Sequence, residues 1–587
     1  MPKITIPIVG QAYKMPTLQL DAQTCINWYL SADPTGKFPS VLLPDPGLET
    51  WAEVSGGKSV RGLFELNGIL YGVIDDKFYI FDNNGNEKHI GTLKTSIGNV
   101  RFTANDTQLF LTDTKYGYVY QLVDSTTHEA GDFFVIEAAS SIIGDPTFTG
   151  SGLNDMTTGG AYTATVQKNY RVEIQTPGTI DTFRWSDSAG DTWNEENVQI
   201  TTQTQTLNDG VQITFDYATG HTATDRWDFT ATSDTAFYVP IIPTYQDTYG
   251  IYAKQVSRRW YISESEDFSR VNALDYAQAN VWPDNLVVAI SIREEVWLIC
   301  RTTTEIWYDV GIAQFPFERR TNLVIKYGTV APYSVAVAHN NILLLLGNNE
   351  EGGRVVIMMV NYEPQIISTE PLNYELAKYD VIDDAIGFTY QWNGHIFYCL
   401  IFPSEDKTWI YDLTTKSWHE KRSTLTNPQP NISPTKQGRW RANNFVFYND
   451  KCLVGDFESG KIYKLSDSVY TENGNLIWYE RATQHLNKNL HLLSLYSFQL
   501  DMQKGVGLTQ ESDYGYDPKV MLQISKDDGI SWGNEKWKSI GKTGKYKQRI
   551  KWNQLGTSDS FTFKIRSTNP VYNVILGAVI EVEELEQ

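Results

Sequence analysis

One short unit recurs along this chain of 587 residues and constrains its fold more than any other feature. A polar turn carrying Asn, Asp or Gly leads into an apolar run, and a second turn leads into a run that ends near Tyr or Trp. Tight hairpin turns need residues of these types, because such turns require positive φ. Copies of the unit begin at Asn67, Asn105, Asn340, Asn393 and Asn449. The pattern predicts antiparallel hairpins along most of the chain.

The spacing of these hairpins favours a β-propeller. Four-stranded units roughly 40–50 residues apart are typical of propeller blades. Aromatic residues make up 13% of the chain and hydrophobic residues 41%, which favours strands and supplies a core. We therefore predict an all-β fold built on a β-propeller, with another meandering antiparallel sheet as the alternative. The best helix candidate is residues 373–384, a stretch that could equally be a loop.

Two segments depart from the blade pattern and suggest how the chain is divided. We predict an N-terminal arm and the first blades over 1–145, an inserted small β-domain over 146–235, the remaining blades over 236–470, and a C-terminal β-sheet or sandwich region over 471–587. Propeller loops tolerate such insertions because the two ends of a loop lie close together. A surface loop is expected over 427–434. Residues 2–16 are expected to form an extended arm that packs on a neighbouring subunit or an adaptor, with an edge strand of the first blade as the alternative.

The charge and the cysteines limit the possible partners and compartments. The net charge is −21, from 70 acidic and 49 basic residues, which makes the chain a poor binder of duplex DNA. An acidic wall would instead let DNA slide past, or simply keep a large assembly soluble. Four separated cysteines form no C-x-x-C pair and are expected to be reduced core residues. We see no signal peptide and no apolar run long enough to span a membrane.

One motif predicts a specific turn. Residues 525–532 have the spacing Ser-x-Asp-x-Gly-x-Ser-Trp, which resembles the Asp-box of sialidase-type propellers. The residues expected to form this structural turn are Ser525, Asp527, Gly529 and Trp532, with the Asp accepting backbone N–H bonds and the Trp packing beneath. A degraded copy lies at 185–193 within the predicted insertion. In the families that carry the box, it lies away from any catalytic centre.

No convergent catalytic or metal-binding pattern stands out. The chain has no H-E-x-x-H, no G-x-S-x-G and no Walker-type loop. The turn at 82–85 lacks the later acidic ligand of a calcium loop. We therefore predict no enzyme activity, no catalytic or metal-binding residues and no cofactor.

Three stretches carry a resemblance to a known family. The first comprises residues 8–13, 25–29, 43–48 and 60–63, and the second comprises 303–311, 315–319 and 327–336. The third is the Asp-box followed by 540–546 and 552–556. Together they resemble the packaged-DNA stabilisation proteins, or tail hub proteins, of short-tailed (podovirus) phages. The segment 146–232 departs from that family and resembles small β modules of other phage structural proteins.

The resemblance implies a role in the virion. Proteins of this family form a ring, expected here with six copies, that attaches below the portal and its head–tail adaptor after DNA packaging. The ring or nozzle closes the channel, carries the tail needle, tailspike or fibre proteins, and lets DNA pass through its lumen without sequence-specific binding. The resemblance also implies assembly in the host cytoplasm and a final place in the tail. Two alternatives stay open: a receptor- or carbohydrate-binding propeller of the tail, and a propeller glycosidase.

Overall fold

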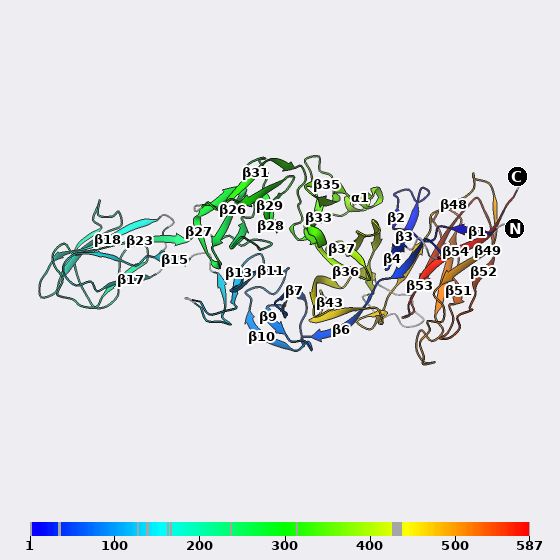
Figure 1. Ribbon diagram of the computed structural model, residues 1–587, viewed down its shortest axis with the longest axis horizontal. Helices are drawn as coiled ribbons and strands as arrows, with labels where there is room; N and C mark the ends of the chain where they lie inside the picture. The colour runs from blue at the N-terminus through cyan, green and yellow to red at the C-terminus, as the bar shows by residue number, and fades with distance from the viewer. Residues whose placement is uncertain are drawn as a thin grey trace.

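The predicted all-β fold is confirmed: in the computed structural model, strands make up almost all of the regular structure. The structure describes residues 3–32, 37–125, 128–136, 140–160, 162, 164, 167–234, 237–312, 315–424 and 437–585. Figure 1 shows three parts along the long axis: the strands of 140–234 at one end, a ring of sheets in the middle, and the C-terminal strands with both termini at the other end. The loop predicted at 427–434 lies outside the described residues.

Seven four-stranded units surround one axis and form the propeller. Neighbouring units cover both faces of each sheet, so a strand such as β12 is buried along its whole length. The first three units are β7 (Val60–Leu66), β8 (Ile69–Ile74), β9 (Lys77–Phe81) and β10 (Glu87–Thr92); β11 (Arg101–Ala104), β12 (Gln108–Thr112), β13 (Gly117–Gln121) and β14 (Phe133–Ile136); and β24 (Thr244–Gln246), β25 (Tyr249–Ala253), β26 (Arg259–Glu264) and β27 (Asp267–Gln278).

The remaining four units follow the same meander. They are β28 (Leu286–Ile292), β29 (Glu295–Cys300), β30 (Thr304–Asp309) and β31 (Phe317–Ile325); β32 (Ala336–Ala338), β33 (Ile342–Gly347), β34 (Val355–Val360) and β35 (Glu363–Ile366); β36 (Ile386–Trp392), β37 (His395–Phe402), β38 (Lys407–Asp412) and β39 (Ser417–Glu420); and β42 (Ala442–Tyr448), β43 (Lys451–Asp456) and β44 (Lys461–Ser466) with β6 (Gly47–Glu53). Two short 3-10 turns, Pro332–Ser334 and His339–Asn341, flank β32.

Strand β6 closes the propeller ring. It precedes the first unit in sequence but pairs antiparallel with β44 of the last unit, from Gly47 opposite Ser466 to Glu53 opposite Lys461. The first strands of these two units, β7 and β42, lie side by side. Gly455 on the next strand, β43, also lies against β7, because a Cβ there would lie 2.4 Å from Val60 Cγ1. Closure by a strand from the other end of the propeller sequence protects the ring from opening.

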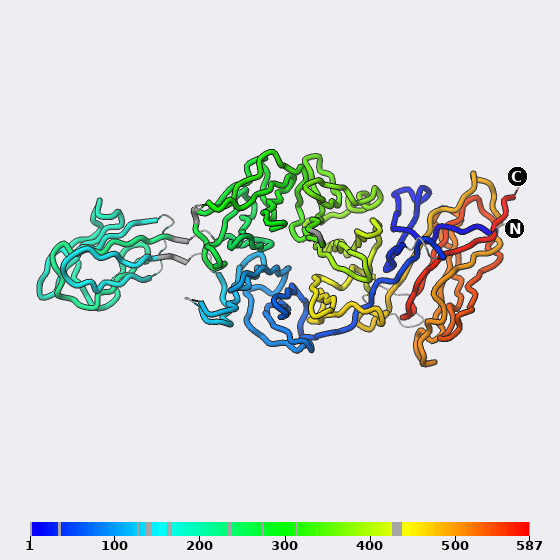
Figure 2. Tube along the Cα trace, viewed as in Figure 1, coloured from blue at the N-terminus to red at the C-terminus, as the bar shows by residue number. Residues whose placement is uncertain are grey.

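The segment between β14 and β24 forms two sheets that project from the propeller (Figure 2). Alternating burial along β18 places Val172 in a core with Phe215 and Trp227 between the sheets. One sheet contains β15 (Ser140–Ile143), β16 (Thr147–Thr149), β18 (Lys168–Thr176), β19 (Thr182–Ser186), β20 (Glu195–Gln199) and β23 (Arg226–Asp234); the other contains β17 (Met156–Gly160), β21 (Gln205–Thr206) and β22 (Val211–Phe215).

Two sheets at the C-terminal end pack face to face as a sandwich. Phe498, Leu522 and Phe563 lie in the core between them. One sheet contains β1 (Lys3–Ile6), β4 (Trp28–Ala32), β5 (Ser40–Pro44), β49 (Leu493–Met502), β52 (Ile550–Ser558) and β54 (Ile575–Glu584). The other contains β2 (Tyr13–Lys14), β3 (Ala22–Ile26), β47 (Tyr479–Ala482), β48 (Leu486–Asn487), β50 (Lys519–Ser525), β51 (Lys536–Ser539) and β53 (Ser560–Ser567).

This second sheet continues into the propeller. Strand β3 pairs with β47 on one side and, through Ile26 opposite Glu420, with β39 of the sixth propeller unit on the other. The propeller unit and the sandwich sheet therefore form one sheet of eleven strands. Short pairs line the same region: β40 (Arg422–Thr424) with β41 (Gln437–Arg439), and β45 (Thr471–Glu472) with β46 (Asn475–Leu476).

The N-terminal segment differs from both expectations for it. Strand β1 pairs with β54 of the same chain rather than forming an arm or an edge of the first blade. Ile6 and Ile8 are buried in the sandwich core, and burial of these side chains is the physical reason that the segment stays on its own chain. The rest of the predicted division into domains stays a prediction, although the inserted sheets begin at Ser140 rather than at residue 146.

Helix α1 (Glu370–Ala377) begins before the stretch 373–384 predicted for it and overlaps the first part of that stretch. Pro371 stands in its first turn, where a missing N–H costs nothing. All four cysteines are free, and Cys25, Cys300 and Cys399 are buried. Among the described helices, none has the length and apolar character that crossing a membrane requires.

Candidate functional site at the junction of propeller and sandwich

Asn27 holds the chain where the sandwich meets the propeller. Its side-chain Nδ2 donates to the carbonyl oxygens of Arg422 and Trp478, at 2.9 and 2.8 Å, and its Oδ1 accepts from the backbone N–H of Arg422. Asn27 also has φ of 58°, a left-handed conformation that Asn adopts more readily than most residues. One buried amide therefore joins β3 and β4 to segments about 400 and 450 residues away in sequence.

A buried cluster of charged residues lies beside Asn27. Asp45, His419 and Lys421 are each at most 2% exposed. His419 Nε2 lies 3.4 Å from Asp45 Oδ2, and Lys421 Nζ lies 3.7 Å from Asp45 Oδ1 and 4.0 Å from the centre of the Trp440 ring. Burial alone would raise the pKa of Asp45, but Lys421 and His419 outweigh it and hold that pKa below its usual value.

Glu472 adds a second carboxyl group to this cluster. It is 3% exposed and accepts a hydrogen bond from the Ser423 hydroxyl. Burial raises its pKa to about 7, against the opposing effects of Ser423 and Lys421. Glu472 is thus a group of the cluster that changes charge near neutral pH. These residues come from the link before β6, from β39 and the link after it, and from strand β45, so they meet where the chain passes between the two parts.

Arg481 fixes the N-terminal segment to the sandwich. Its side chain is fully buried, and its guanidinium donates to the carbonyl oxygens of Ile8, Gln11 and Thr24 at 2.8 to 3.0 Å. A fourth bond reaches the side chain of Gln23. Burial lowers the pKa of Arg481, and the fork of N–H donors offsets this cost by satisfying backbone groups that would otherwise be unpaired.

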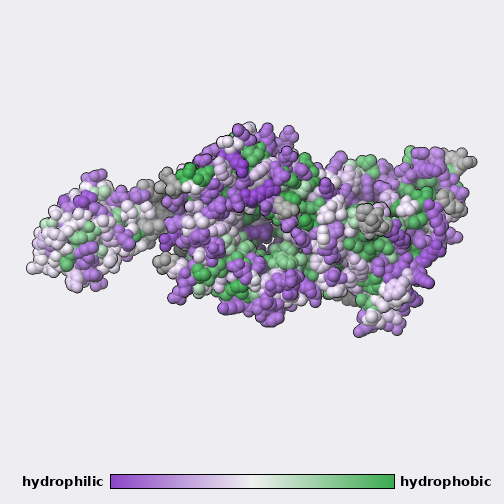
Figure 3. Space-filling model, viewed as in Figure 1, coloured by the Kyte–Doolittle hydropathy of each residue, from purple (hydrophilic) through white to green (hydrophobic). Residues whose placement is uncertain are grey.

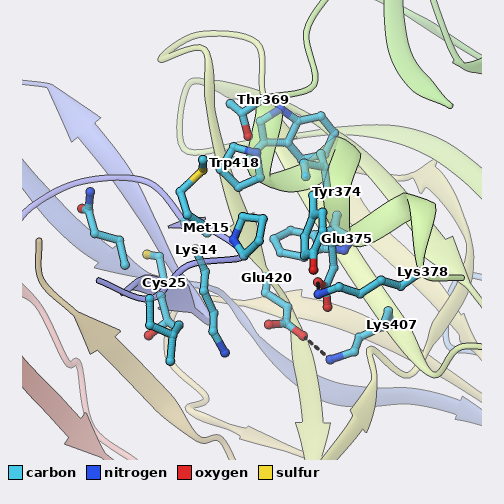
Figure 4. Close-up of a pocket in the computed structure, with 18 of the residues that line it drawn as sticks. Lys14, Met15, Cys25, Thr369, Tyr374, Glu375, Lys378, Lys407, Trp418 and Glu420 are labelled. Atoms are coloured by element: carbon cyan, nitrogen blue, oxygen red, sulfur yellow. Dashed lines mark hydrogen bonds and ion pairs between the residues drawn. The ribbon is translucent and has the colours of Figure 1, made fainter. Parts of the chain in front are cut away.

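A cavity of about 370 Å³ opens between the N-terminal hairpin, α1 and the sixth propeller unit. Figure 4 shows Met15 on one side, Tyr374 of α1 and Lys378 just after it on the other, and Glu420 joined to Lys407. Glu420 accepts from Lys407 at 3.3 Å and from Arg422 at 2.6 and 2.7 Å. Burial would raise the pKa of Glu420, but these two cations lower it below its usual value. The ion pairs of Glu420 therefore cross-link the cavity wall, which suits a rigid connection between the propeller and the sandwich.

The predicted Asp-box residues meet in one turn between β50 and β51. Ser525 Oγ accepts from the backbone N–H of Gly529 at 2.8 Å and donates to Asp527 Oδ1, which also accepts from the Ser531 N–H. Gly529 has φ of 85° and lies beside Trp532, and a Cβ there would lie 2.9 Å from Ala22 Cβ. The turn therefore packs against the N-terminal hairpin, and its purely structural role stays a prediction.

The degraded copy in the insertion forms a similar turn. Ser186 Oγ accepts from the N–H groups of Ser188 and Gly190, at 3.1 and 3.0 Å, and Gly190 has φ of 94°. In both boxes, the serine hydroxyl oxygen accepts from the N–H of the glycine four residues later. The acidic residue differs in position between the two boxes. The shared serine and glycine are therefore what defines both turns.

A second cavity of about 520 Å³ lies on the propeller axis, lined by loops of several units. The hollow in the middle of the propeller is visible in Figure 3. Arg439 stacks on Phe457 at 3.7 Å, and burial lowers its pKa to about 10. Asp384 accepts from the Ser404 backbone N–H, and the Tyr333 hydroxyl has no hydrogen-bond partner among the described residues. None of these three groups makes, among the described residues, the contact between base and nucleophile that covalent catalysis uses.

The described residues hold no group of three or more His, Cys, Asp or Glu that could bind a metal ion. The site is an arrangement of hydrogen bonds and ion pairs that joins the propeller to the sandwich.

Two family models match the chain. One, described as bacteriophage P22 Gp10, beta-propeller, matches residues 147–470, which are 324 of the 587 residues. The other, bacteriophage P22 Gp10, beta-sandwich, matches residues 478–583.

The chain belongs to the phage P22 Gp10 family. The predicted family, the packaged-DNA stabilisation or tail hub proteins of short-tailed phages, is confirmed. The protein is therefore a structural component of a phage tail. The propeller match begins after the first two propeller units and includes the inserted sheets except β15, whereas the sandwich match begins at β47 and ends within β54.

Other comparisons add less to the Gp10 assignment. No curated protein matches the chain. Solved structures that align include the computationally designed Ika8 protein, with 8% identity, 71% of this chain and 99% of that chain covered, and a TM-score of 0.31. The Pan2 WD40 domain of Neurospora crassa has 7% identity, coverage of 72% and 94%, and a TM-score of 0.33. Apo AztD from Citrobacter koseri has 10% identity, coverage of 71% and 94%, and a TM-score of 0.28. TM-scores this low support no inference.

Sequence reasoning missed most of the junction between propeller and sandwich. Asn27 and Asp45 stand within stretches that carry the family resemblance, but the roles of Glu472 and Arg481 have no local signal. Their partners lie hundreds of residues away, as with Arg481 and the Ile8 carbonyl, which are 473 residues apart. Arg481 stands between Glu480 and Ala482 on the short strand β47, and this local pattern gives no indication of its partner.

Proposed function

We propose that this protein is one subunit of the tail hub ring that attaches below the portal and its adaptor. In this role it closes the channel after DNA packaging and anchors distal tail parts. The observation that carries the proposal is the match of both the propeller and the sandwich to the Gp10 family. Partners would be further copies of the chain, expected as six, the portal and head–tail adaptor, and the needle, tailspike or fibre proteins.

The architecture suits a rigid subunit that is repeated around a ring. Closure by β6 fixes the propeller, and the eleven-stranded sheet fixes the propeller to the sandwich. A rigid body repeats around an axis through heterologous contacts that close into a ring. Because the junction network is buried within one chain, a subunit would keep the same shape before and after assembly.

The genetic test is infection with a phage that cannot make this protein. Particles made without it should package DNA and then lose it, so that nuclease-protected DNA falls severalfold while capsid yield is unchanged. Expression of the chain from a plasmid should restore protection. Stable, filled particles without the protein would contradict a role in channel closure.

Binding of a host receptor or carbohydrate is a second candidate function, favoured by the tip of the inserted sheets. Leu153, Ile180 and Tyr217 are 37%, 47% and 62% exposed. His221 fixes their loops, with its ring nitrogens 2.9 Å from Asp155 and from Asp181. A Tyr217→Ala variant that assembles normally but adsorbs to cells at the unchanged rate would remove this candidate.

A further inference from the structure

Positive charge gathers on one short stretch of the sandwich. Residues 536–551 carry seven basic side chains and no carboxylate, in a chain whose net charge is −21. The seven are Lys536, Lys538, Lys542, Lys545, Lys547, Arg549 and Lys551. The facing segment 503–518 adds Lys504 with Glu511, Asp513 and Asp517, and Glu535 precedes the stretch. Eight basic and four acidic residues give this region a net charge of +4, opposite in sign to the whole chain.

Part of this charge has a simple explanation in the sheet. Strand β51 lies at the edge of its sheet, paired only with β50 among the described strands. Lysines on an edge strand prevent pairing with another chain, which accounts for Lys536 and Lys538. The same explanation does not extend to the loop 540–549 that follows, because that loop offers no open strand edge. The loop lysines and arginine therefore need another role.

The loop is held in place and its charges are not neutralised. Thr543 Oγ1 donates to the Gly507 carbonyl, and the Lys545 N–H donates to the Lys542 carbonyl at 2.9 Å. Of the seven cations, only Lys551 forms an ion pair within the described part of the chain, with Glu581 at 3.0 Å. Lys545, Lys547 and Arg549 are exposed. A fixed loop presents them without the entropy cost of ordering a flexible one.

Exposed aromatic side chains alternate with these cations. Tyr546 is 69% exposed between Lys545 and Lys547, and Trp537 is 45% exposed on β51. Cations with interspersed aromatic rings are typical of surfaces that follow a nucleic-acid backbone and stack on its bases or sugars. An acidic protein partner would instead need an apolar contact core surrounded by polar groups, which this loop lacks.

We propose that the loop 540–549 binds DNA through its phosphates, with no preference for sequence. Lys545, Lys547 and Arg549 make the phosphate contacts, and Tyr546 packs on the sugar or base beside them. The acidic remainder of the chain repels DNA, so the contact is confined to this loop. The inference depends on the residues of the loop and holds whether or not the protein forms the proposed ring.

The test is binding of fluorescent DNA to the full chain. A 20-base-pair duplex and a single strand of the same length are titrated at several salt concentrations from 50 to 200 mM. Binding should weaken linearly in log K against log salt. The triple variant K545Q/K547Q/R549Q should lose at least tenfold in affinity at 50 mM salt, and the slope should fall by about one for each cation removed. Tighter binding of the single strand would assign Tyr546 a stacking contact.

The matched control is K77Q/K88Q/K115Q, three exposed lysines on the first two propeller units. It changes net charge equally and should leave DNA affinity within twofold. No binding at 50 mM salt, or equal loss in the two triple variants, would overturn the proposal. A loop variant that keeps DNA binding but loses binding to polyglutamate would show that the loop recognises an acidic protein instead, and would also overturn it.

Discussion

Glu472 gives the junction a stability that depends on pH. Its folded-state pKa of about 7 lies above its ordinary value of 4.5, so its contribution to stability is fully present below pH 4.5 and lost as pH rises through 7. The loss is on the order of 3 kcal/mol at 1.36 kcal/mol per pKa unit. Glu472→Gln should remove this loss, raising the urea midpoint at pH 8 and leaving it nearly unchanged at pH 4.5.

The exposed Glu49 on β6 supplies the control for this measurement. Glu49 lies on the strand that pairs in parallel with β45. Glu49→Gln should therefore leave the difference in urea midpoint between pH 4.5 and pH 8 the same as in the original chain. If Glu472→Gln has the same urea midpoint as the original chain at both pH values, ionisation of this buried carboxyl group does not determine the pH dependence of stability.

Arg481 should be among the costliest single residues to replace. Arg481→Met removes the donor that Arg481 supplies to the carbonyl oxygens of Ile8, Gln11 and Thr24, at about 1–3 kcal/mol for each of these groups that stays buried and unsatisfied. We expect a clear drop in Tm and early protease cleavage before residue 22. Arg549→Met, at an exposed site in the same sandwich, should change neither. Unaltered protease resistance in Arg481→Met would show that the segment is held by Ile6 and Ile8 alone.

Asp527 tests the structural role assigned to the Asp-box. Asp527→Ala removes the acceptor for the Ser531 N–H and for the Ser525 hydroxyl, which should cost about 1 kcal/mol. Because the turn packs against Ala22 and not against a ligand, particle assembly should be unchanged. Loss of assembly in a variant that unfolds at the normal denaturant concentration would mean that the turn contacts another virion protein.

At the scale of elements, the inserted sheets should be removable. Entry strand β15 and exit strand β23 pair with each other, from Ser140 opposite Asp234, so the two ends lie close enough for a short linker. Replacing 140–234 by a Gly-Ser linker should leave the propeller folded, because the inserted sheets have a core of their own. Circular dichroism and calorimetry should show one unfolding transition fewer. Aggregation of the shortened chain would mean that the propeller depends on the insertion.

The elements that sequence predicts well are those with local signals. Hairpins such as β8 to β9 follow turn residues and apolar runs that stand next to each other in the chain, and the Asp-box turn spans only eight residues. The pairing of β1 with β54 was not predicted for residues 2–16, because nothing local in the sequence indicates it. The closing strand β6 and the charge cluster around Asp45 are contacts over about 400 residues, and such contacts depend on the whole topology.

At the scale of the whole molecule, three β structures form one elongated body (Figure 1). Its parts differ in charge: the inserted segment 146–235 carries 12 acidic and four basic residues, whereas 471–587 carries 14 of each. We expect repulsion between these acidic surfaces to keep free subunits apart. A ring would then form only where other virion proteins bring subunits together, which would delay closure of the channel until packaging is complete.

The mass of the purified protein by light scattering, alone and mixed with the portal–adaptor complex, tests this account most directly. A single chain of 66.7 kDa in isolation that becomes a closed ring of several copies on the complex is the result we predict. A monomer that ignores the complex, yet binds or cleaves a surface glycan, would contradict the hub and favour a receptor-binding or enzymatic role.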